Sequence, residues 1–200
     1  MAKPILAVDI DDVLFPFVAG VLADHNRRCG TAFELSDAEH FGFDRLWGGT
    51  LEEAIIEVQS FLDRDHRAVK PIAGAQEVLG RLADDYHVMA LTSRSPALER
   101  LSRDWLDHHF AGVVTDLVLV GNCYTGVLRT KADVCSELGA LCLVDDDLNY
   151  ITQCANSGVR GVLFGNGYKW NRCEVLPSGV VRAKNWHEVE RHLDGIVVRV

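Results

Sequence analysis

The sequence predicts an α/β fold: a Rossmann-like parallel sheet flanked by helices, with a small helical cap inserted after the first strand. After residue 70, short apolar segments alternate with amphipathic segments, a pattern typical of parallel strands that helices cover on both faces. Before residue 70, a long stretch with helical periodicity separates the first apolar segment from the second, and it is too long for an ordinary loop. We therefore expect a core formed by residues 1–15 and 71–200 and a cap formed by residues 16–70.

The composition indicates a globular protein that does not bind a polymeric anion. The 200 residues are 48% hydrophobic, which is enough for a packed core. The formal net charge of -9 disfavours binding of a nucleic acid polymer, although a small phosphorylated metabolite remains compatible with it. The chain has neither a signal-peptide pattern nor an apolar stretch of about 18 residues, so we expect a cytoplasmic protein without a membrane segment. The sequence leaves the oligomeric state open.

Residues 16–70 contain two predicted helices. The first carries an apolar stripe at helical spacing and ends near Gly30. The second begins at Thr50, which forms the pattern of a capping box with Glu53 three residues later. The side chains that should face inward are Phe17, Val18, Val21 and Leu22 in the first helix and Ile55, Val58, Phe61 and Leu62 in the second. Together they predict a small helical unit over the edge of the sheet.

The core alternates strands and helices in the order expected of a parallel sheet. Ser95 and Pro96 open one helix, Thr130 begins another with a capping-box pattern, and Gly139 ends that second helix. The predicted strands are 5–8, 87–92, 117–120, 141–144 and 159–164, and the predicted helices are 74–85, one from Ser95, 130–139 and one ending near Gly158.

Polar side chains directly follow several of these strands. Ligands bind outside the carboxyl ends of parallel strands, so the residues just after each apolar run indicate the site. Two carboxylates, Asp9 and Asp11, turn toward the same face, where they repel each other unless something positive lies between them. The full set comprises Asp9, Asp11 and Asp12 after the first strand, Thr92, Ser93 and Arg94 after the second, Asp145, Asp146 and Asp147 after the fourth, and Lys131 at the start of the preceding helix.

Carboxylates, hydroxyls and an ammonium group in one place predict a magnesium-dependent phosphoryl site. Carboxylate oxygens are ligands that Mg2+ prefers, and the ion relieves their repulsion. The ion, a lysine and hydroxyl donors together stabilise the charge that develops on a transferring phosphoryl group. One carboxylate can attack the phosphorus to form an aspartyl phosphate. A second carboxylate can protonate the leaving alcohol and later deprotonate the attacking water.

The ordered motifs resemble those of the haloacid dehalogenase (HAD)-like phosphohydrolases. They are DIDDV at 9–13, then Thr92, Lys131 and the pair Asp145 and Asp146. The resemblance covers residues 4–165. In family members that have a helical cap, the cap is inserted after the first motif, which is where this chain has its long helical stretch. The resemblance implies that Asp9 is the nucleophile, that Asp11 is the general acid and base, and that Thr92 and Lys131 bind the phosphate. It also implies that magnesium is held by Asp9, Asp145 and the backbone carbonyl of Asp11. Asp146 would orient Lys131 or a metal-bound water. Ser93 and Arg94, next to Thr92, are further candidates for phosphate binding.

A narrower likeness points to the 5′-nucleotidase and deoxyribonucleotidase branch of this superfamily. The segments that carry it are TSR at 92–94, Trp105 with Leu106, and YKWNR at 168–172. It implies a nucleoside monophosphate as substrate. Two positions distinguish the chain within the superfamily: Asp12 stands where many members have glycine, and the second aspartate of the D-x-D motif is not needed by the dehalogenases themselves.

Three other functions remain open at the level of the sequence. The protein could hydrolyse a sugar phosphate or another small metabolite, or it could bind a phosphorylated ligand without catalysis. A phosphoacceptor receiver domain also combines an acidic pair, a phosphorylatable aspartate, a threonine and a lysine on a parallel sheet. A receiver carries its acidic pair at the first strand, whereas this chain has D-x-D first and the pair last.

Aromatic residues of the cap are candidates for substrate selection. Phe17 follows the catalytic motif, and Trp47 lies in a glycine-containing stretch with weak helical periodicity. Either side chain could stack on a nucleobase, or both could belong to the cap's own small core.

The cysteines and histidines do not predict a zinc site. The six cysteines include no C-x-x-C pair, and the eight histidines show no close metal-binding pattern. We expect most of the cysteines to be buried thiols.

Overall fold

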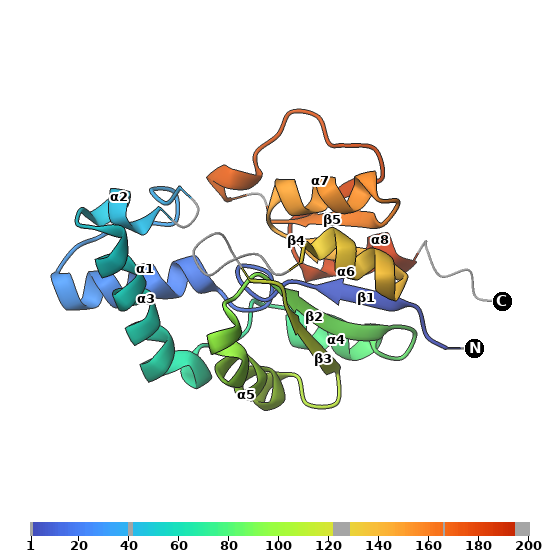
Figure 1. Cartoon of the computed structure of the whole chain (residues 1–200), viewed down its shortest axis with the longest axis horizontal. Helices are drawn as coiled ribbons and strands as arrows, with labels where there is room; N and C mark the ends of the chain where they lie inside the picture. Colours follow the sequence, from blue (N-terminus) through green and yellow to red (C-terminus); the bar gives the residue numbers. More distant parts are fainter. Residues whose placement is uncertain (1, 40–41, 122–128, 166, 195–200) are drawn as a thin grey trace.

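The computed structural model describes residues 2–39, 42–121, 129–165 and 167–194. In these ranges six strands form one parallel sheet with the order β3-β2-β1-β4-β5-β6 (Figure 1). The strands are β1 (Ile5–Val8), β2 (His87–Thr92), β3 (Val114–Leu119), β4 (Ala140–Asp145), β5 (Arg160–Phe164) and β6 (Val180–Ala183). This architecture confirms the predicted α/β class.

β1 lies inside the sheet, and its position determines where a ligand can bind. Its side chains alternate between two apolar clusters, with Leu6 and Val8 in one and Ala7 in the other, so both faces of the strand are buried. Val8 pairs with Ala90 of β2 on one side and with Val144 of β4 on the other. The strand order reverses at β1, and such a switch point opens a crevice at the carboxyl ends of the strands.

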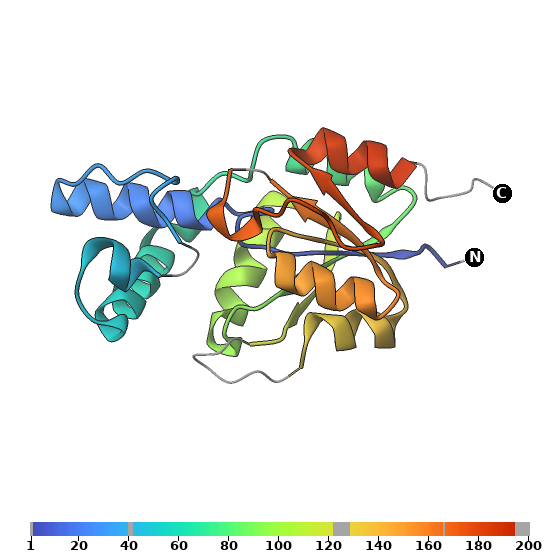
Figure 2. The same cartoon turned by 90° about the horizontal axis from the view of Figure 1, so that it is seen from above.

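Helices cover both faces of the sheet. The face that carries Leu6 and Val8 is covered by α4 (Ala75–Leu82), α5 (Glu99–His109) and α8 (Trp186–Asp194). The face that carries Ala7 is covered by α6 (Lys131–Leu138) and α7 (Leu148–Asn156). Figure 2 shows α8 on one side of the sheet and α6 and α7 on the other. The two clusters together form the hydrophobic core that holds the strand ends in register.

Two buried tryptophans of the core hold the segments on either side of the cap. Trp105 of α5 donates its Nε1–H to the carbonyl of Val69 at 2.9 Å. Trp186 of α8 donates to the carbonyl of Val13, directly after the D-x-D motif, at 3.0 Å. Both indole rings are fully buried, so these hydrogen bonds fix the chain where it leaves the sheet and where it returns.

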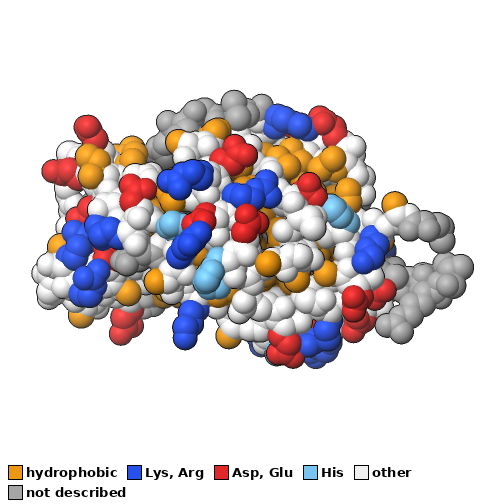
Figure 3. Space-filling view, turned by 90° about the horizontal axis from the view of Figure 1, so that it is seen from below, with side chains coloured by type: hydrophobic (Ala, Val, Ile, Leu, Met, Phe, Trp, Pro, Cys, Tyr) orange, Lys and Arg blue, Asp and Glu red, His pale blue; other side chains and the backbone are white. Residues whose placement is uncertain are grey.

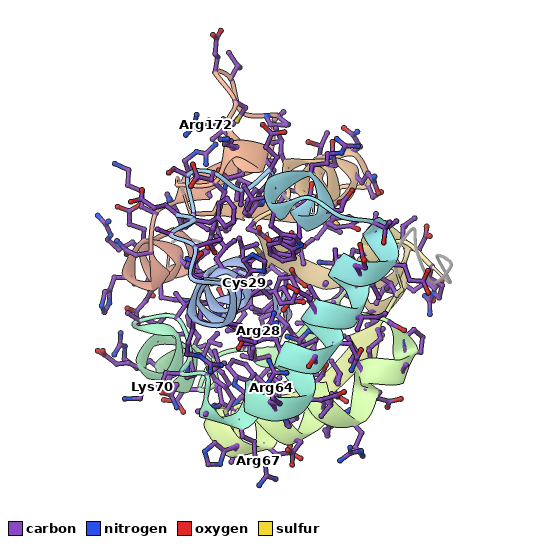
Figure 4. All side chains as sticks on the ribbon, turned by 90° about the vertical axis from the view of Figure 1, so that its left-hand side faces the viewer. Arg28, Cys29, Arg64, Arg67, Lys70 and Arg172 are labelled. Carbon is purple, nitrogen blue, oxygen red and sulfur yellow. The ribbon has the colours of Figure 1, made fainter. Side chains whose placement is uncertain are left out.

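Residues 16–70 form helices that extend beyond one end of the sheet (Figure 1). They are α1 (Phe17–Cys29), α2 (Phe43–Trp47), α3 (Leu51–Asp65) and the 3-10 helix η1 (His66–Ala68). The buried Asp24 of α1 accepts hydrogen bonds from Arg28 of α1 at 2.8 Å and Arg64 of α3 at 2.9 Å, and both arginines lie between these helices in Figure 4. The capping box predicted at Thr50 is present.

Some elements differ from the sequence prediction. Ser95 caps a 3-10 helix, η2 (Pro96–Leu98), and the α-helix that follows begins only at Glu99. β3 begins at Val114 and not at residue 117. β6 and α8 are additional elements; β6 has only four residues and includes Arg182, so it lacks an apolar run that periodicity can detect.

Charged side chains of both signs lie on the face that Figure 3 displays. Basic and acidic side chains are interspersed there, without a broad basic area. Within the described ranges, each helix is too short or too polar to cross a lipid bilayer.

Candidate active site

Side chains from the carboxyl ends of β1, β2 and β4 meet at one point. The backbone N–H of Asp9 donates to the carbonyl of Val144 at 2.9 Å, which extends the contact between β1 and β4 by one residue. Asp145 is the last residue of β4, and Thr92 is the last residue of β2. All three polar side chains are buried. Asp9 and Asp145 therefore lie at the ends of neighbouring strands, and Thr92 ends the strand on the other side of β1.

Lys131 reaches this cluster from the first turn of α6. The predicted capping box at Thr130 is formed and fixes the start of the helix. The lysine side chain is 1% exposed, and its Nζ lies 2.6 Å from Asp145 Oδ2 and 2.9 Å from Asp9 Oδ1. The ring of Tyr150 lies beside the ammonium group, with 4.6 Å between Nζ and the ring centroid. Lys131 thus bridges the two carboxylates that follow β1 and end β4.

The buried charges of the site do not balance. Asp9, Asp145 and Asp146 can each place one carboxylate oxygen within 4.8 Å of the others. Burial raises the pKa of all three carboxyls, that of Asp9 to about 7, although Lys131 opposes the shift at Asp9 and Asp145. Burial alone would lower the pKa of Lys131, but the two carboxylates beside it outweigh burial and raise it. With all three carboxyls ionised, the cluster would carry two negative charges beyond the Lys131 ammonium, and a divalent cation would stabilise that ionised form.

The donor atoms of the site fit a hard divalent cation such as Mg2+. Asp9 Oδ1 is buried, and its contact with Lys131 is not aligned as a hydrogen bond, so no hydrogen bond satisfies it among the described residues. Asp145 and Asp146 supply further carboxylate oxygens. An all-oxygen, carboxylate-rich group of this kind suits Mg2+ better than zinc, which prefers nitrogen and sulfur ligands.

Asp146 is hydrogen-bonded by a residue outside the predicted set. The resemblance implied that it orients Lys131 or a metal-bound water, and the Lys131 ammonium group lies beside Asp9 and Asp145. Asp146 Oδ2 instead accepts a hydrogen bond from Trp170 Nε1 at 2.6 Å. Trp170 belongs to η3 (Lys169–Asn171) and stacks on Tyr168, with ring centroids 4.5 Å apart. The YKWNR segment, which the sequence marked only through a family likeness, therefore contacts the site directly.

Arg94 pairs with Asp11, a contact that the sequence analysis did not predict. Its Nη2 lies 2.6 Å from Asp11 Oδ1 and its Nε lies 2.9 Å from Asp11 Oδ2. A third nitrogen, Nη1, donates to Ser102 Oγ at 3.0 Å. The arginine side chain is only 6% exposed, so its charge is directed at the carboxylate and not at an incoming phosphate.

Thr92 and Ser93 keep the positions expected of phosphate donors. Thr92 Oγ1 accepts a hydrogen bond from the backbone N–H of Arg94 at 3.2 Å, which leaves its own hydroxyl hydrogen available to donate. Ser93 Oγ is buried beside the Tyr150 hydroxyl, and their contact opposes the burial that raises the pKa of Tyr150. Both hydroxyls could donate to a phosphate oxygen, Ser93 in competition with Tyr150.

Asp12 stands where many members of the superfamily have glycine, and its backbone conformation and contacts show how an aspartate fits there. Its φ of 56° lies in the left-handed region, which glycine adopts freely and aspartate tolerates better than most other residues. Its carboxylate accepts a hydrogen bond from the backbone N–H of Val18, in the first turn of α1, at 3.2 Å. A negative charge is favourable at that end of a helix. Asp12 therefore ties the loop after β1 to the first cap helix.

The cap aromatics pack mainly against one another. Phe17 is 6% exposed, and its ring centroid lies 6.1 Å from that of Phe43. Trp47 stacks on Phe43 at 4.9 Å and on His25 at 4.2 Å. This packing favours the alternative that they form the cap's own core, most clearly for the buried Phe17. Trp47 is half-buried, and its indole is stacked against the rings of both Phe43 and His25.

A second group of possible metal ligands lies in the cap and was missed by the sequence analysis. His25 Nδ1 lies 2.9 Å from Glu57 Oε2 and 3.9 Å from Cys29 Sγ. The spacing of four residues on α1 could have signalled part of this group, but Glu57 comes from α3. Glu57 Oε2 also pairs with Arg28 at 3.0 Å, so its charge is already compensated without a metal.

The fold and the site together define a HAD-like phosphatase, an enzyme of the phosphoric monoester hydrolase class. The family model for "5′ nucleotidase, deoxy (pyrimidine), cytosolic type C protein" matches residues 3–200. The chain therefore belongs to this 5′-nucleotidase family. No curated protein sequence matches it.

Solved structures of HAD hydrolases share the fold at low sequence identity. A predicted phosphatase from Clostridium acetobutylicum has a TM-score of 0.67 at 15% identity, covering 98% of this chain and 100% of that one. The HAD-hydrolase YfnB from Bacillus subtilis, bound to magnesium, has a TM-score of 0.65 at 13% identity, covering 97% and 100%. A HAD family hydrolase from Deinococcus radiodurans, with bound phosphate and sodium, has a TM-score of 0.63 at 14% identity, covering 100% and 99%. At these identities the likeness concerns the fold alone.

Proposed function

We propose that the protein is a magnesium-dependent phosphomonoesterase that acts through an aspartyl phosphate, with nucleoside monophosphates as its substrates. The observation that carries the proposal is the buried contact of Asp9 with Lys131, beside Asp145, at the switch point of the sheet. Membership in the 5′-nucleotidase family supports the reaction class. The buried carboxylate excess supports the metal.

In the first step, an oxygen of the Asp9 carboxylate attacks the phosphorus of the substrate. A bond forms between this oxygen and phosphorus while the bond from phosphorus to the leaving alcohol oxygen breaks. The carboxyl group of Asp11 gives its proton to the leaving oxygen, so the alcohol departs neutral. Lys131 and the hydroxyls of Thr92 and Ser93 bind the phosphoryl oxygens, on which negative charge is concentrated.

In the second step, water hydrolyses the aspartyl phosphate. The Asp11 carboxylate removes a proton from the water as its oxygen attacks phosphorus, and the bond from phosphorus to Asp9 breaks. This releases inorganic phosphate, regenerates the Asp9 carboxylate and returns Asp11 to its protonated form. One phosphomonoester and one water thus give one alcohol and one phosphate.

Asp9, Asp145 and the backbone carbonyl of Asp11 would hold the magnesium ion, with Asp146 beside them. When bound, the ion supplies positive charge to the phosphoryl group and screens the carboxylates from one another. Asp145 is the most firmly placed of these residues, because Lys131 binds its Oδ2 and the backbone N–H of Asp147 binds its Oδ1 at 2.9 Å.

The substrate class rests on the family description, which includes the words deoxy and pyrimidine. We infer that pyrimidine deoxynucleoside monophosphates are the first compounds to test against sugar phosphates. Residues 16–70 would act as the cap over a core of 1–15 and 71–200. The buried Phe17 and the indole of Trp47, which stacks on Phe43 and His25, would then belong to the cap's own core. The family description also supports the predicted cytoplasmic location through its word cytosolic.

The decisive experiment replaces the nucleophile while keeping its shape. Asp9→Asn should abolish hydrolysis of a nucleoside monophosphate, and a chelator should do the same to the wild type until Mg2+ is restored. The matched control is Asp107→Asn, because Asp107 is exposed on α5, away from the strand ends. If Asp9→Asn kept activity within about tenfold of wild type, the aspartyl-phosphate mechanism would be wrong.

A further inference from the structure

Asp11, the proposed acid and base, is held by a residue that has its own set of fixed contacts. The Arg94 guanidinium binds both oxygens of the Asp11 carboxylate, at 2.6 Å and 2.9 Å. This fork geometry restricts rotation of the carboxylate in a way that one hydrogen bond from a lysine would not. Both side chains are largely buried, with 6% of Arg94 and 14% of Asp11 exposed, so water competes little for the contact.

Arg94 is itself fixed from several directions. Its Nη1 donates to Ser102 Oγ of α5 at 3.0 Å, and its backbone N–H donates to Thr92 Oγ1 at 3.2 Å. The guanidinium also lies over the ring of Phe15, with 5.0 Å between its central carbon and the ring centroid. Phe15 is completely buried and packs edge-on against Trp105 at 5.1 Å. The arginine is therefore a rigid part of the core that ends in the active site.

These contacts direct the Arg94 guanidinium at Asp11 and give it a use in orienting the acid. An acid must point one oxygen at the leaving group, and misplacement by about 1 Å can cost about 100-fold in rate. Each Asp11 oxygen uses one lone pair for Arg94 and keeps another, on which it can carry the proton to the leaving oxygen and later receive one from water. The same contact can serve both steps, since a neutral carboxyl and a carboxylate each retain an acceptor oxygen for the arginine.

We propose that Arg94, anchored by Ser102 and Phe15, is a positioning residue that sets the orientation of Asp11 for proton transfer. The proposal rests on the proposed function, in which Asp11 is the acid and base. It deepens that function by assigning Asp11 a partner that follows β2. Arg94, the third residue of the TSR segment, thereby has a role other than phosphate binding.

The experiment compares two substrates whose leaving groups need different help. An aryl phosphate with an acidic phenol leaves readily, whereas a nucleoside monophosphate or glycerol phosphate needs protonation. Arg94→Met should lower kcat on the alkyl phosphate by about 10- to 100-fold and on the aryl phosphate by less than about threefold, with KM nearly unchanged. Arg94→Lys keeps the charge but loses the fork, so it should restore only part of the rate.

A double-mutant cycle tests whether Arg94 acts through Asp11. In an Asp11→Asn background, Arg94→Met should cost less than about twofold further, because the group that it positions is gone. Equal losses on both substrates, or a loss in the double mutant as large as in the wild-type background, would overturn the proposal. If Arg94→Met does not fold, Ser102→Ala can replace it, because it removes only one anchor of Arg94. Ser102→Ala should lower kcat less, but again more on the alkyl phosphate than on the aryl phosphate. A loss of kcat that is equal on both substrates would overturn the proposal. Asp9→Asn on the same substrates separates the two proposals, since activity there refutes the proposed function whatever Arg94 does.

Discussion

Lys131→Met removes the ammonium group that lies between Asp9 and Asp145, while keeping a side chain of similar length. Lys131 is 1% exposed, and its Nζ lies 2.6 Å and 2.9 Å from oxygens of the two carboxylates. Removing one partner from a buried ion pair leaves the other charge uncompensated, which typically costs about 3–5 kcal/mol. For a chain of this length that corresponds to a fall in melting temperature of about 6–20 °C.

The assay is urea unfolding at neutral pH in the presence of a chelator, so that a bound metal cannot replace the missing charge. The control is Lys169→Met, because Lys169 is 37% exposed and its nearest carboxylate, Glu39, lies 3.7 Å away. That substitution should change the free energy of unfolding by less than about 1 kcal/mol. A loss at Lys131 no larger than at Lys169 would refute the reasoning, since it would mean that the buried carboxylates do not depend on this ammonium group.

Two further predictions concern stability elsewhere in the chain. A Cβ at Gly161 would lie 2.7 Å from a side-chain atom of α7 and 3.2 Å from one of β6, so Gly161→Ala should cost about 1–3 kcal/mol in urea unfolding. Gly80→Ala, in α4 with open space around it, should be neutral or stabilise by up to about 1 kcal/mol; equal effects would contradict the packing argument. Burial would raise the pKa of Asp24, but Arg28 and Arg64 lower it below its ordinary value. The folded state therefore binds this proton less tightly than the unfolded state, and the stabilisation is present above about pH 4 and lost as the pH falls further. Asp24→Asn should thus destabilise the protein more at about pH 7 than at about pH 3 in thermal melts, and a loss independent of pH would exclude the ion-pair explanation.

The parts of the site that the sequence predicts are those that depend on local rules. Asp9, Thr92 and Asp145 each stand at the end of a short apolar run, and parallel strands bring such ends to one edge of a sheet. Lys131 follows a capping box, which fixes where its helix begins and so where its side chain starts. These inferences need only a few neighbouring residues and the general geometry of α/β folds.

The side-chain partners could not be predicted in the same way. Arg94 and Asp11 are separated by 83 positions in the chain, and their contact depends on how Phe15 and Ser102 orient the guanidinium. Trp170 reaches Asp146 from a segment without regular periodicity. Such contacts follow from tertiary packing, which a pattern of residue types along the chain does not encode.

The contacts of the four carboxylates also support one of them as the nucleophile. Both oxygens of Asp11 bind Arg94, and both oxygens of Asp145 are bound, one by Lys131 and one by a backbone N–H. Asp146 has one oxygen bound to an indole N–H at 2.6 Å and lies at the β4 side of the cluster. Asp9 follows β1, which lies between β2 and β4. It is therefore next to Thr92 and Ser93 at the end of β2 and to Asp145 and Asp146 at the end of β4. Its Oδ1 has no well-aligned hydrogen bond among the described residues, although Lys131 Nζ lies 2.9 Å from it. A nucleophile must lie beside groups that bind the phosphoryl oxygens, and Asp9 lies between Lys131 and the end of β2.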